Sequence, residues 1–277
     1  MTSTRSTGDI ERAKRVAGER YLGAPVELSL GMDVSEFRPG LVLLHLPDPG
    51  DDLASGMVAP VGLSVLADCA GGVALSAYQL IGVSGPTVEF RVDYTGVSPR
   101  GAVRAESSVT DEVGGTGRAA VTILDSTDAV IARAQGYYVL VSDPPEAAED
   151  PGTVPRPGVV EVLRAAVRAA TDPTMVPVPV VRALANPRMQ VHGGVLLAIG
   201  HLAQREVQLV DVDRAGALTP MSMRVDYLRP VPVDGGELSC RTDYVRRGRG
   251  FHTLRTSLVR ADGKVATVVT GLWAVAR

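Results

Sequence analysis

The sequence predicts an α+β protein made of two similar halves, each an antiparallel sheet wrapped round a central apolar helix. The segments TVEFRVDY at 87–94 and PMSMRVDY at 220–227 are nearly the same strand, 133 positions apart. Before each strand stands an apolar stretch that is too hydrophobic on all sides for a surface helix. A helix of that kind must be enclosed, and a curled antiparallel sheet can enclose it.

The first half begins with a surface helix and continues with an enclosed one. Residues 9–20 carry an apolar stripe at helical spacing, so this helix should lie on a sheet surface. Residues 60–80 should form the enclosed helix. The strands that follow are expected at 87–95, 102–111, 117–125 and 129–141. In the first strand the alternation predicts one buried face, made of Val88, Phe90, Val92 and Tyr94.

The second half repeats this order. Helices are expected at 159–170 and 193–205, and strands at 220–228, 237–247, 251–261 and 264–276. The segment 142–158 is rich in proline and acidic residues, which is typical of a linker. We therefore expect hotdog domains at 1–141 and 159–277. Together they would form a double hotdog, a pseudo-dimer within one chain.

Composition and charge exclude several kinds of partner. The chain has 28 basic and 31 acidic residues and a net charge of -3, which gives no field to hold nucleic acid or an anionic membrane. Cys69 and Cys240 lie in apolar stretches, which favours a reducing compartment over a disulfide or a metal site. No leader peptide is expected, and no apolar run approaches the length of a membrane span. We expect a cytoplasmic protein.

The stretch VHGGVLLAIGH at 191–201 carries the strongest chemical signal. A loop with free backbone N–H groups that leads into a helix suits a developing negative charge. Asn186 stands six positions before His192, and RVDYLRPVPVDG follows downstream. The repeat offset places Asp68 opposite His201 and Pro60 opposite Gly193.

These motifs resemble the hotdog acyl-CoA thioesterases of the phenylacetic-acid-pathway (PaaI-like) type, over about 30–138 and 186–273. In that family two hotdog units share each site. One unit gives an asparagine and a His-Gly-Gly loop, and the other gives a helical aspartate and a Ser or Thr at the start of the next strand. The resemblance implies hydrolysis of an acyl-CoA or acyl-carrier-protein thioester to free acid and thiol, with coenzyme A as part of the substrate and neither cofactor nor metal ion.

Neither half has the full set. The second half matches the loop at Asn186, His192, Gly193 and Gly194, and the first half keeps Asp68 and Thr87. The remaining positions have lost the family's residues: Leu53, Ala59, Pro60, Val61, His201 and Pro220. Because the losses are complementary, we expect a single composite site between the halves. Two related halves have two pseudo-symmetric junctions, and the opposite junction would collect only the lost positions. Pro60 alone would disable it, since proline has no backbone N–H to stabilise an oxyanion.

Each residue of the composite site has a possible role. The N–H of Gly193 suits the oxyanion of thioester cleavage. Asp68 could activate water or attack the carbonyl directly. Thr87 could hold the water or orient the carboxylate, and Asn186 and His192 could fix the loop or touch the thioester. Taken singly, a buried aspartate is more often bonded to nearby backbone, and glycines often serve close packing.

Two further expectations concern the ligand and the assembly. Arg246, Arg247 and Arg249 in RRGRG could meet the phosphates of coenzyme A beside Gly194, although a solvated hairpin explains them as well. Because hotdog relatives of this type often pair two dimers, a homodimer of this double-length chain is expected.

Two other functions compete with the thioesterase. One is a noncatalytic acyl-thioester-binding protein with a degenerate site. The other is a hotdog hydratase or dehydratase, which needs a histidine paired with a carboxylate. Asp68 has no histidine nearby in sequence, which favours hydrolysis.

Overall fold

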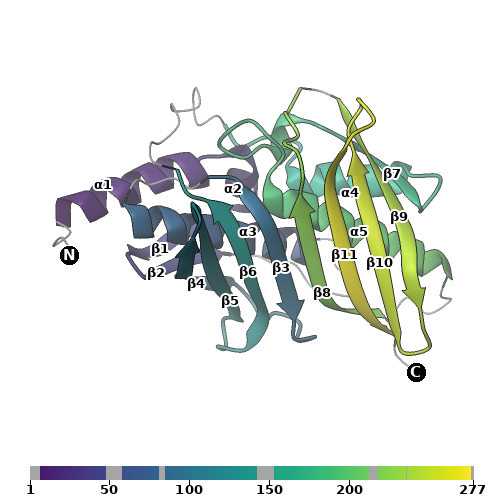
Figure 1. Cartoon of the computed structure of the whole chain (residues 1–277), viewed down its shortest axis with the longest axis horizontal. Coiled ribbons are helices and arrows are strands. Elements are labelled where there is room, and N and C mark those ends of the chain that lie inside the picture. Colours follow the sequence, from purple (N-terminus) through teal and green to yellow (C-terminus); the bar gives the residue numbers. More distant parts are fainter. Residues whose placement is uncertain are drawn as a thin grey trace.

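The computed structural model describes residues 7–47, 58–80, 85–141, 153–211, 218–234 and 236–275. Leu53 and most of the expected linker fall outside these ranges. One sheet of 11 strands dominates the fold, in the order β1-β2-β4-β5-β6-β3-β8-β11-β10-β9-β7. All its neighbouring strands are antiparallel. The helices lie against one face of the sheet (Figure 1).

Within its described residues, the first half contains three helices, a π-helical turn and six strands. These are α1 (Thr7–Ala17), the π turn Gly18–Leu22, α2 (Pro25–Leu30), β1 (Asp33–Arg38), β2 (Leu41–Leu46), α3 (Val58–Gln79), β3 (Thr87–Tyr94), β4 (Val103–Val113), β5 (Thr116–Asp125) and β6 (Val130–Val139). Both expected helices and all four expected strands are present. The sequence prediction lacked α2, β1 and β2.

The part of the second half that the structure describes contains two helices, a 3₁₀ turn and five strands. These are α4 (Val159–Ala169), β7 (Met175–Pro179), the 3₁₀ turn Arg182–Leu184, α5 (Gly193–Asp211), β8 (Leu218–Tyr227), β9 (Glu237–Arg247), β10 (Phe251–Val259) and β11 (Val265–Val275). Its main strands pair in the order β8-β11-β10-β9, which matches β3-β6-β5-β4 of the first half. Sequence similarity between the halves is therefore matched by the same local topology.

The two expected sheets are joined into one, because β3 and β8 pair with each other. Arg91 lies directly opposite Arg224, and the pairs Glu89–Asp226 and Asp93–Ser222 flank them. The repeat offset of 133 relates 89 to 222, 91 to 224 and 93 to 226. It therefore maps the pair Glu89–Asp226 onto the pair Asp93–Ser222 and the arginine pair onto itself, as a local twofold axis requires. Each arginine is neutralised by an acidic residue two positions along its own strand, Arg91 by Asp93 at 2.7 Å and Arg224 by Asp226 at 2.9 Å.

Helix α3 is enclosed as the sequence predicts. Every side chain from Pro60 to Ala77 is buried, and α3 packs on the strands of the first half while α5 packs on those of the second. The expectation that no run approaches a membrane span was wrong, because Pro60–Gln79 is long and apolar enough. That stretch is 94% buried inside the protein, as the core helix of a folded domain is.

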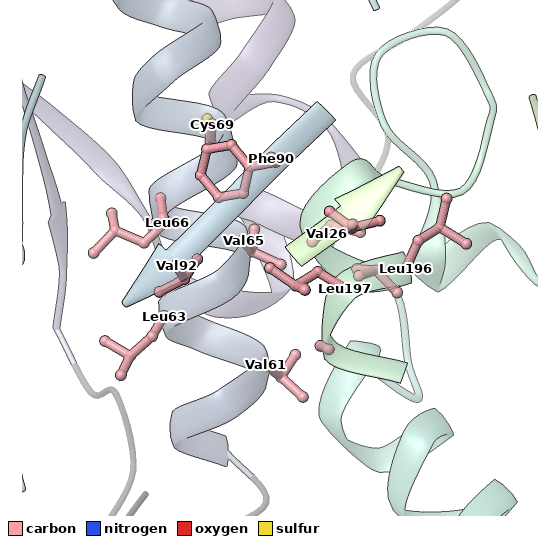
Figure 2. Packing of buried hydrophobic residues seen from close by; sticks show 14 of the residues in the cluster. Val26, Val61, Leu63, Val65, Leu66, Cys69, Phe90, Val92, Leu196 and Leu197 are labelled. Atoms are coloured by element: carbon pink, nitrogen blue, oxygen red, sulfur yellow. The ribbon is translucent and has the colours of Figure 1, made fainter. Parts of the chain in front are cut away.

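The two central helices contact each other closely at Gly194. A side chain on this glycine would place its first carbon 2.5 Å from the carbonyl oxygen of Ser64 and 2.6 Å from the Cα of Val65. Figure 2 shows Phe90 and Val92 of β3 lying across α3, and Leu197 of α5 on the side of α3 that carries Val65. The N-terminus of α5 is thereby held against the middle of α3.

Strand β3 departs from simple alternation at its start. The register against β6 shifts between Thr87 and Glu89, and Val88, which alternation places on the buried face, is 43% exposed. A bulge of this kind turns a side chain to the other face of the sheet. Thr87 therefore points toward α3, where strict alternation would have directed it away.

Candidate active site

Asp68 lies in the middle of α3, where its side chain is only 6% exposed. Its Oδ1 accepts a hydrogen bond from the Thr87 hydroxyl at 2.9 Å, and its Oδ2 accepts one from the Gly194 N–H at 2.8 Å. Burial raises the pKa of Asp68, while His192, Thr87 and Gly194 partly oppose that rise. A carboxyl with a raised pKa is a stronger base once it is ionised.

The N-terminus of α5 is capped from both halves of the chain. His192 occupies the N-cap position, and its Nδ1 lies 3.0 Å from the Gly194 N–H that also reaches Asp68. An acidic group at this end of a helix is favoured by the partial positive charge there. The first half thus supplies the carboxylate for a helix of the second half.

Gly193 is the first residue of α5 and is partly exposed. Its amide N–H has no hydrogen-bond acceptor among the described residues. A side chain here would overlap the Asp68 carboxylate and lie 3.1 Å from the hydroxyl of Tyr227. A side chain at this position would have to displace the Asp68 carboxylate, whereas glycine leaves it in place and keeps its N–H available at the helix N-terminus.

Glu27 is a site residue that the sequence prediction missed. It lies in α2 with 0% exposure, and its Oε1 is 3.0 Å from Nε2 of His192. Neither of its oxygens has a well-aligned hydrogen bond among the described residues. The signal in the sequence is a carboxylate inside the apolar stretch PVELSL, where an unpaired charge would be costly.

His192 therefore lies between two carboxylates. Its Nδ1 is 3.6 Å from Asp68 Oδ2, on the side of the ring opposite Glu27. Burial by itself would lower the pKa of His192, but Glu27 and then Asp68 outweigh it, and the pKa is raised. Asp68 has no histidine nearby in sequence, but the fold brings His192 to it from more than a hundred residues away, as the expected composite site requires.

Asn186 stabilises its own turn. Its Oδ1 accepts hydrogen bonds from the N–H groups of Arg188 at 2.9 Å and Gln190 at 3.2 Å. The turn leads into Val191 and His192, so Asn186 orders the approach to α5. Of the two roles expected for it, the structure is consistent with fixing the loop.

The arginines of RRGRG are not brought to this site. Arg246 and Arg247 lie opposite Thr253 and His252, and His252 lies opposite Trp273, which faces Pro220. These residues lie level with the first residues of β8. Thr87 lies level with the last residues of β8, near Asp226 and Tyr227, at the other end of the strands. All three arginines are exposed.

The opposite junction between the halves carries His201, Pro60 and Pro220 in place of the proposed site residues. His201, the counterpart of Asp68, is fully buried and packs edge to face on Tyr94 at 5.7 Å and on Trp273 at 5.0 Å. Burial, with Arg205, lowers the pKa of His201 to about 3, so the ring stays neutral. It is a core histidine, although its Nε2 has no partner among the described residues. Pro60 and Pro220 supply neither an N–H nor a hydroxyl.

Comparisons with known proteins agree with a thioesterase. Residues 183–275 match the family described as "Acyl-CoA thioesterase N-terminal domain", whereas a search of curated proteins finds no match.

Solved structures resemble the chain over most of its length. A candidate thioesterase II from Thermobifida fusca is 15% identical with a TM-score of 0.58, covering 92% of this chain and 100% of that one. A tesB protein from Mycobacterium avium subsp. paratuberculosis is 14% identical with a TM-score of 0.56 over 92% and 100%. An acyl-CoA thioesterase II from Mycobacterium marinum is 11% identical with a TM-score of 0.54 over 90% and 96%. The family match, in a chain with the fold of these proteins, supports a thioesterase enzyme whose substrate is an acyl thioester.

Proposed function

We propose that the chain hydrolyses acyl-CoA or acyl-carrier-protein thioesters at one composite site formed by Asp68 and Thr87 of the first half and the loop 192–194 of the second. The observation that carries the proposal is the hydrogen bond of 2.8 Å from the Gly194 N–H to Asp68. This hydrogen bond holds Asp68, the only acidic residue of α3, beside Gly193, whose N–H has no acceptor among the described residues. A base and an oxyanion donor thereby meet at one junction.

The reaction follows from these positions. Asp68 takes a proton from water as the water oxygen attacks the carbonyl carbon, and the Gly193 N–H stabilises the oxyanion that forms. The C–S bond then breaks, the thiolate leaves with a proton, and the free acid remains. Direct attack by Asp68 would form an anhydride that water opens. Single turnover in ¹⁸O-water separates the two routes, because only direct attack leaves ¹⁸O in the Asp68 carboxylate.

We also propose that the chain is a double hotdog, with domains at 1–141 and 159–277. Support comes from the matching strand order of the halves and from the twofold register of β3 and β8. A cytoplasmic location, the homodimer and the absence of nucleic-acid and membrane partners stay predictions. Light scattering of the purified chain tests the homodimer.

Asp68→Asn is the sharpest test of the base. Asparagine keeps one oxygen to accept from the Gly194 N–H, and its NH2 can donate to the Thr87 hydroxyl, so the fold should be retained while the base is lost. With a panel of acyl-CoA substrates and a thiol reagent, we expect kcat to fall by about 10²–10⁴-fold. Asp93→Asn, on the exposed face of β3, serves as the matched control and should keep full activity. Equal turnover by Asp68→Asn would remove the mechanism.

The number of sites provides a second test. Calorimetric titration with a nonhydrolysable acyl-CoA analogue should give one binding site per chain, because Pro60 and His201 disable the other junction. Two equal sites would contradict the composite site. One tight site without turnover of any thioester would instead favour the noncatalytic binding protein.

A hydratase is the second candidate function, because His192 is paired with Glu27 at 3.0 Å and faces Asp68. A histidine paired with a carboxylate is what proton transfer across a carbon–carbon double bond requires. Incubation with an enoyl-CoA distinguishes the two, since hydration gives a hydroxyacyl-CoA and hydrolysis releases free thiol. We expect thiol release.

A further inference from the structure

Tyr227 ends strand β8 beside the proposed site, and its hydroxyl is buried. The oxygen has no hydrogen-bond partner among the described residues, although the residue as a whole is partly exposed. A buried hydroxyl without a partner is unfavourable, since it has lost its water and gained nothing in exchange. Such a group in a native fold calls for an explanation, and one explanation is a partner that is absent from the free protein.

The position of this hydroxyl is defined by Gly193. The point where a side chain on Gly193 would begin is 3.1 Å from Tyr227 Oη and overlaps the Asp68 carboxylate. The hydroxyl, the carboxylate and the backbone of Gly193 therefore border the same small volume. Asp68 is already bonded to Thr87 and Gly194. Within the described part of the chain, the Tyr227 hydroxyl and the Gly193 N–H are then the donors at this volume that have no acceptor.

The repeat supplies an internal comparison. Tyr94 is the counterpart of Tyr227, and at the opposite junction it meets His201, the counterpart of Asp68. There the tyrosine has a partner, with Oη 3.5 Å from His201 Nδ1 and the two rings in edge-to-face contact. The two tyrosines thus occupy matching places, but only the one beside Asp68 keeps an unused hydroxyl.

We propose that the Tyr227 hydroxyl donates a hydrogen bond to the carbonyl oxygen of the thioester and to the oxyanion formed from it, together with the Gly193 N–H. Tyr227 is therefore a second oxyanion donor, and it rests on the thioester hydrolysis proposed above. Burial and then Asp68 raise the pKa of Tyr227 well above its ordinary value, so the hydroxyl keeps its proton for donation.

Tyr227→Phe tests this, because it removes one oxygen and keeps the ring. We expect kcat to fall by about 10²–10³-fold, the usual effect of losing one oxyanion donor, with KM nearly unchanged. The midpoint of thermal unfolding should stay equal or rise, since an unsatisfied hydroxyl has been removed. Tyr94→Phe is the matched control, expected to keep kcat and to lose some stability. A kcat within twofold of the wild type for Tyr227→Phe would overturn the inference.

A binding experiment gives a readout that a structural role would not move. The wild type should bind a CoA ketone analogue, which keeps the carbonyl, more tightly than the corresponding alkyl thioether. Tyr227→Phe should reduce that preference, whereas Tyr94→Phe should not, and an unchanged preference would contradict the proposal. If the wild type releases no thiol from any thioester, the proposed function fails, and the role of Tyr227 fails with it. If the wild type is active and Tyr227→Phe is equally active, only the role of Tyr227 fails.

Discussion

His192 and the two acids beside it set the charge of the proposed site. Glu27 and Asp68 each attract the protonated imidazole, and the imidazolium in turn opposes the effect of burial on Asp68. Removing one member therefore alters the ionisation of the others. This coupling gives two predictions about pH.

The first concerns the acidic limb of the rate profile. As a base, Asp68 works only when ionised, so kcat/KM should rise with pH through its raised pKa. His192 lowers that pKa, so His192→Gln should move the acidic limb to higher pH. The check is kcat/KM measured from about pH 4 to about pH 9. His45→Gln is the control, and a limb that stays in place or moves to lower pH would contradict the prediction.

The second concerns stability. Because Glu27 raises the pKa of His192 in the folded state, protonation of His192 stabilises the fold fully below its unfolded value of about 6.5. That contribution to the free energy of unfolding is lost as pH rises through the raised pKa of folded His192. In Glu27→Gln this pH-dependent loss of stability should be smaller. Urea unfolding below and above this pH window would measure it. Glu161→Gln, on the exposed face of α4, should keep the wild-type slope, and an equally steep slope in Glu27→Gln would refute the prediction.

Sequence reasoning found the Asp68–Thr87–Gly194 set but not the residues that complete it. Asp68 and the glycines stand out because each violates the local pattern of an apolar helix. Glu27 gives the same kind of signal, but in the short stretch PVELSL, and Tyr227 gives none, since it ends the repeated RVDY strand. Their significance depends on distances between segments far apart in the chain. The spacing between RRGRG and Thr87 along the sheet is likewise a property of strand register.

At the scale of elements, the site depends on how closely α3 approaches α5. The contact at Gly194 is made by backbone atoms of Ser64 and Val65, which cannot move aside as a side chain can. The distance from Asp68 to the loop 192–194 is therefore fixed by the helix crossing.

Gly194→Ala should separate the two helices. We expect the free energy of unfolding to fall by about 1–3 kcal/mol from overpacking, and kcat to fall with it because Asp68 moves away from Gly193. Chemical denaturation and thiol release would measure the two effects. Gly18→Ala, where a side chain would meet nothing within 4 Å, is the control and should change neither. A Gly194→Ala protein of wild-type stability would contradict the close packing of α5 on the backbone of α3.

The missed elements have identifiable physical causes. Strand β7 contains two prolines, which argue against a strand, and it is tolerated because it lies at the edge of the sheet. The hairpin of β1 and β2 carries its signal in the Pro39–Gly40 turn, with Gly40 at a φ of 91°. The bulge at Thr87 leaves no mark in the pattern, because the strand on either side looks regular.

At the scale of the whole molecule, the two halves share one sheet and one core. Strands β3 and β8 pair, and one continuous cluster of buried side chains includes residues of both α3 and α5. The only tryptophan, Trp273, lies in the second half and is buried. It therefore reports on one half while the other is perturbed.

We expect the halves to unfold together. Leu66→Ala in α3 should destabilise the protein by about 2–5 kcal/mol, and the Trp273 fluorescence transition should shift with the circular dichroism transition. Val113→Ala, at a position that is 69% exposed, should shift neither. A Trp273 transition that keeps its wild-type midpoint in Leu66→Ala would mean that the second half folds independently.

The twofold register of β3 and β8 has a consequence for how such a molecule can change. In a homodimer of two identical polypeptides, one mutation alters both of the pockets that the twofold axis relates. Here Arg91 and Arg224 face each other across that axis but have separate codons, so either can vary while its mate is kept. Proline at 60 and histidine at 201 would have inactivated every pocket of a symmetric pair. In the composite site proposed above they remove one pocket and leave the other intact.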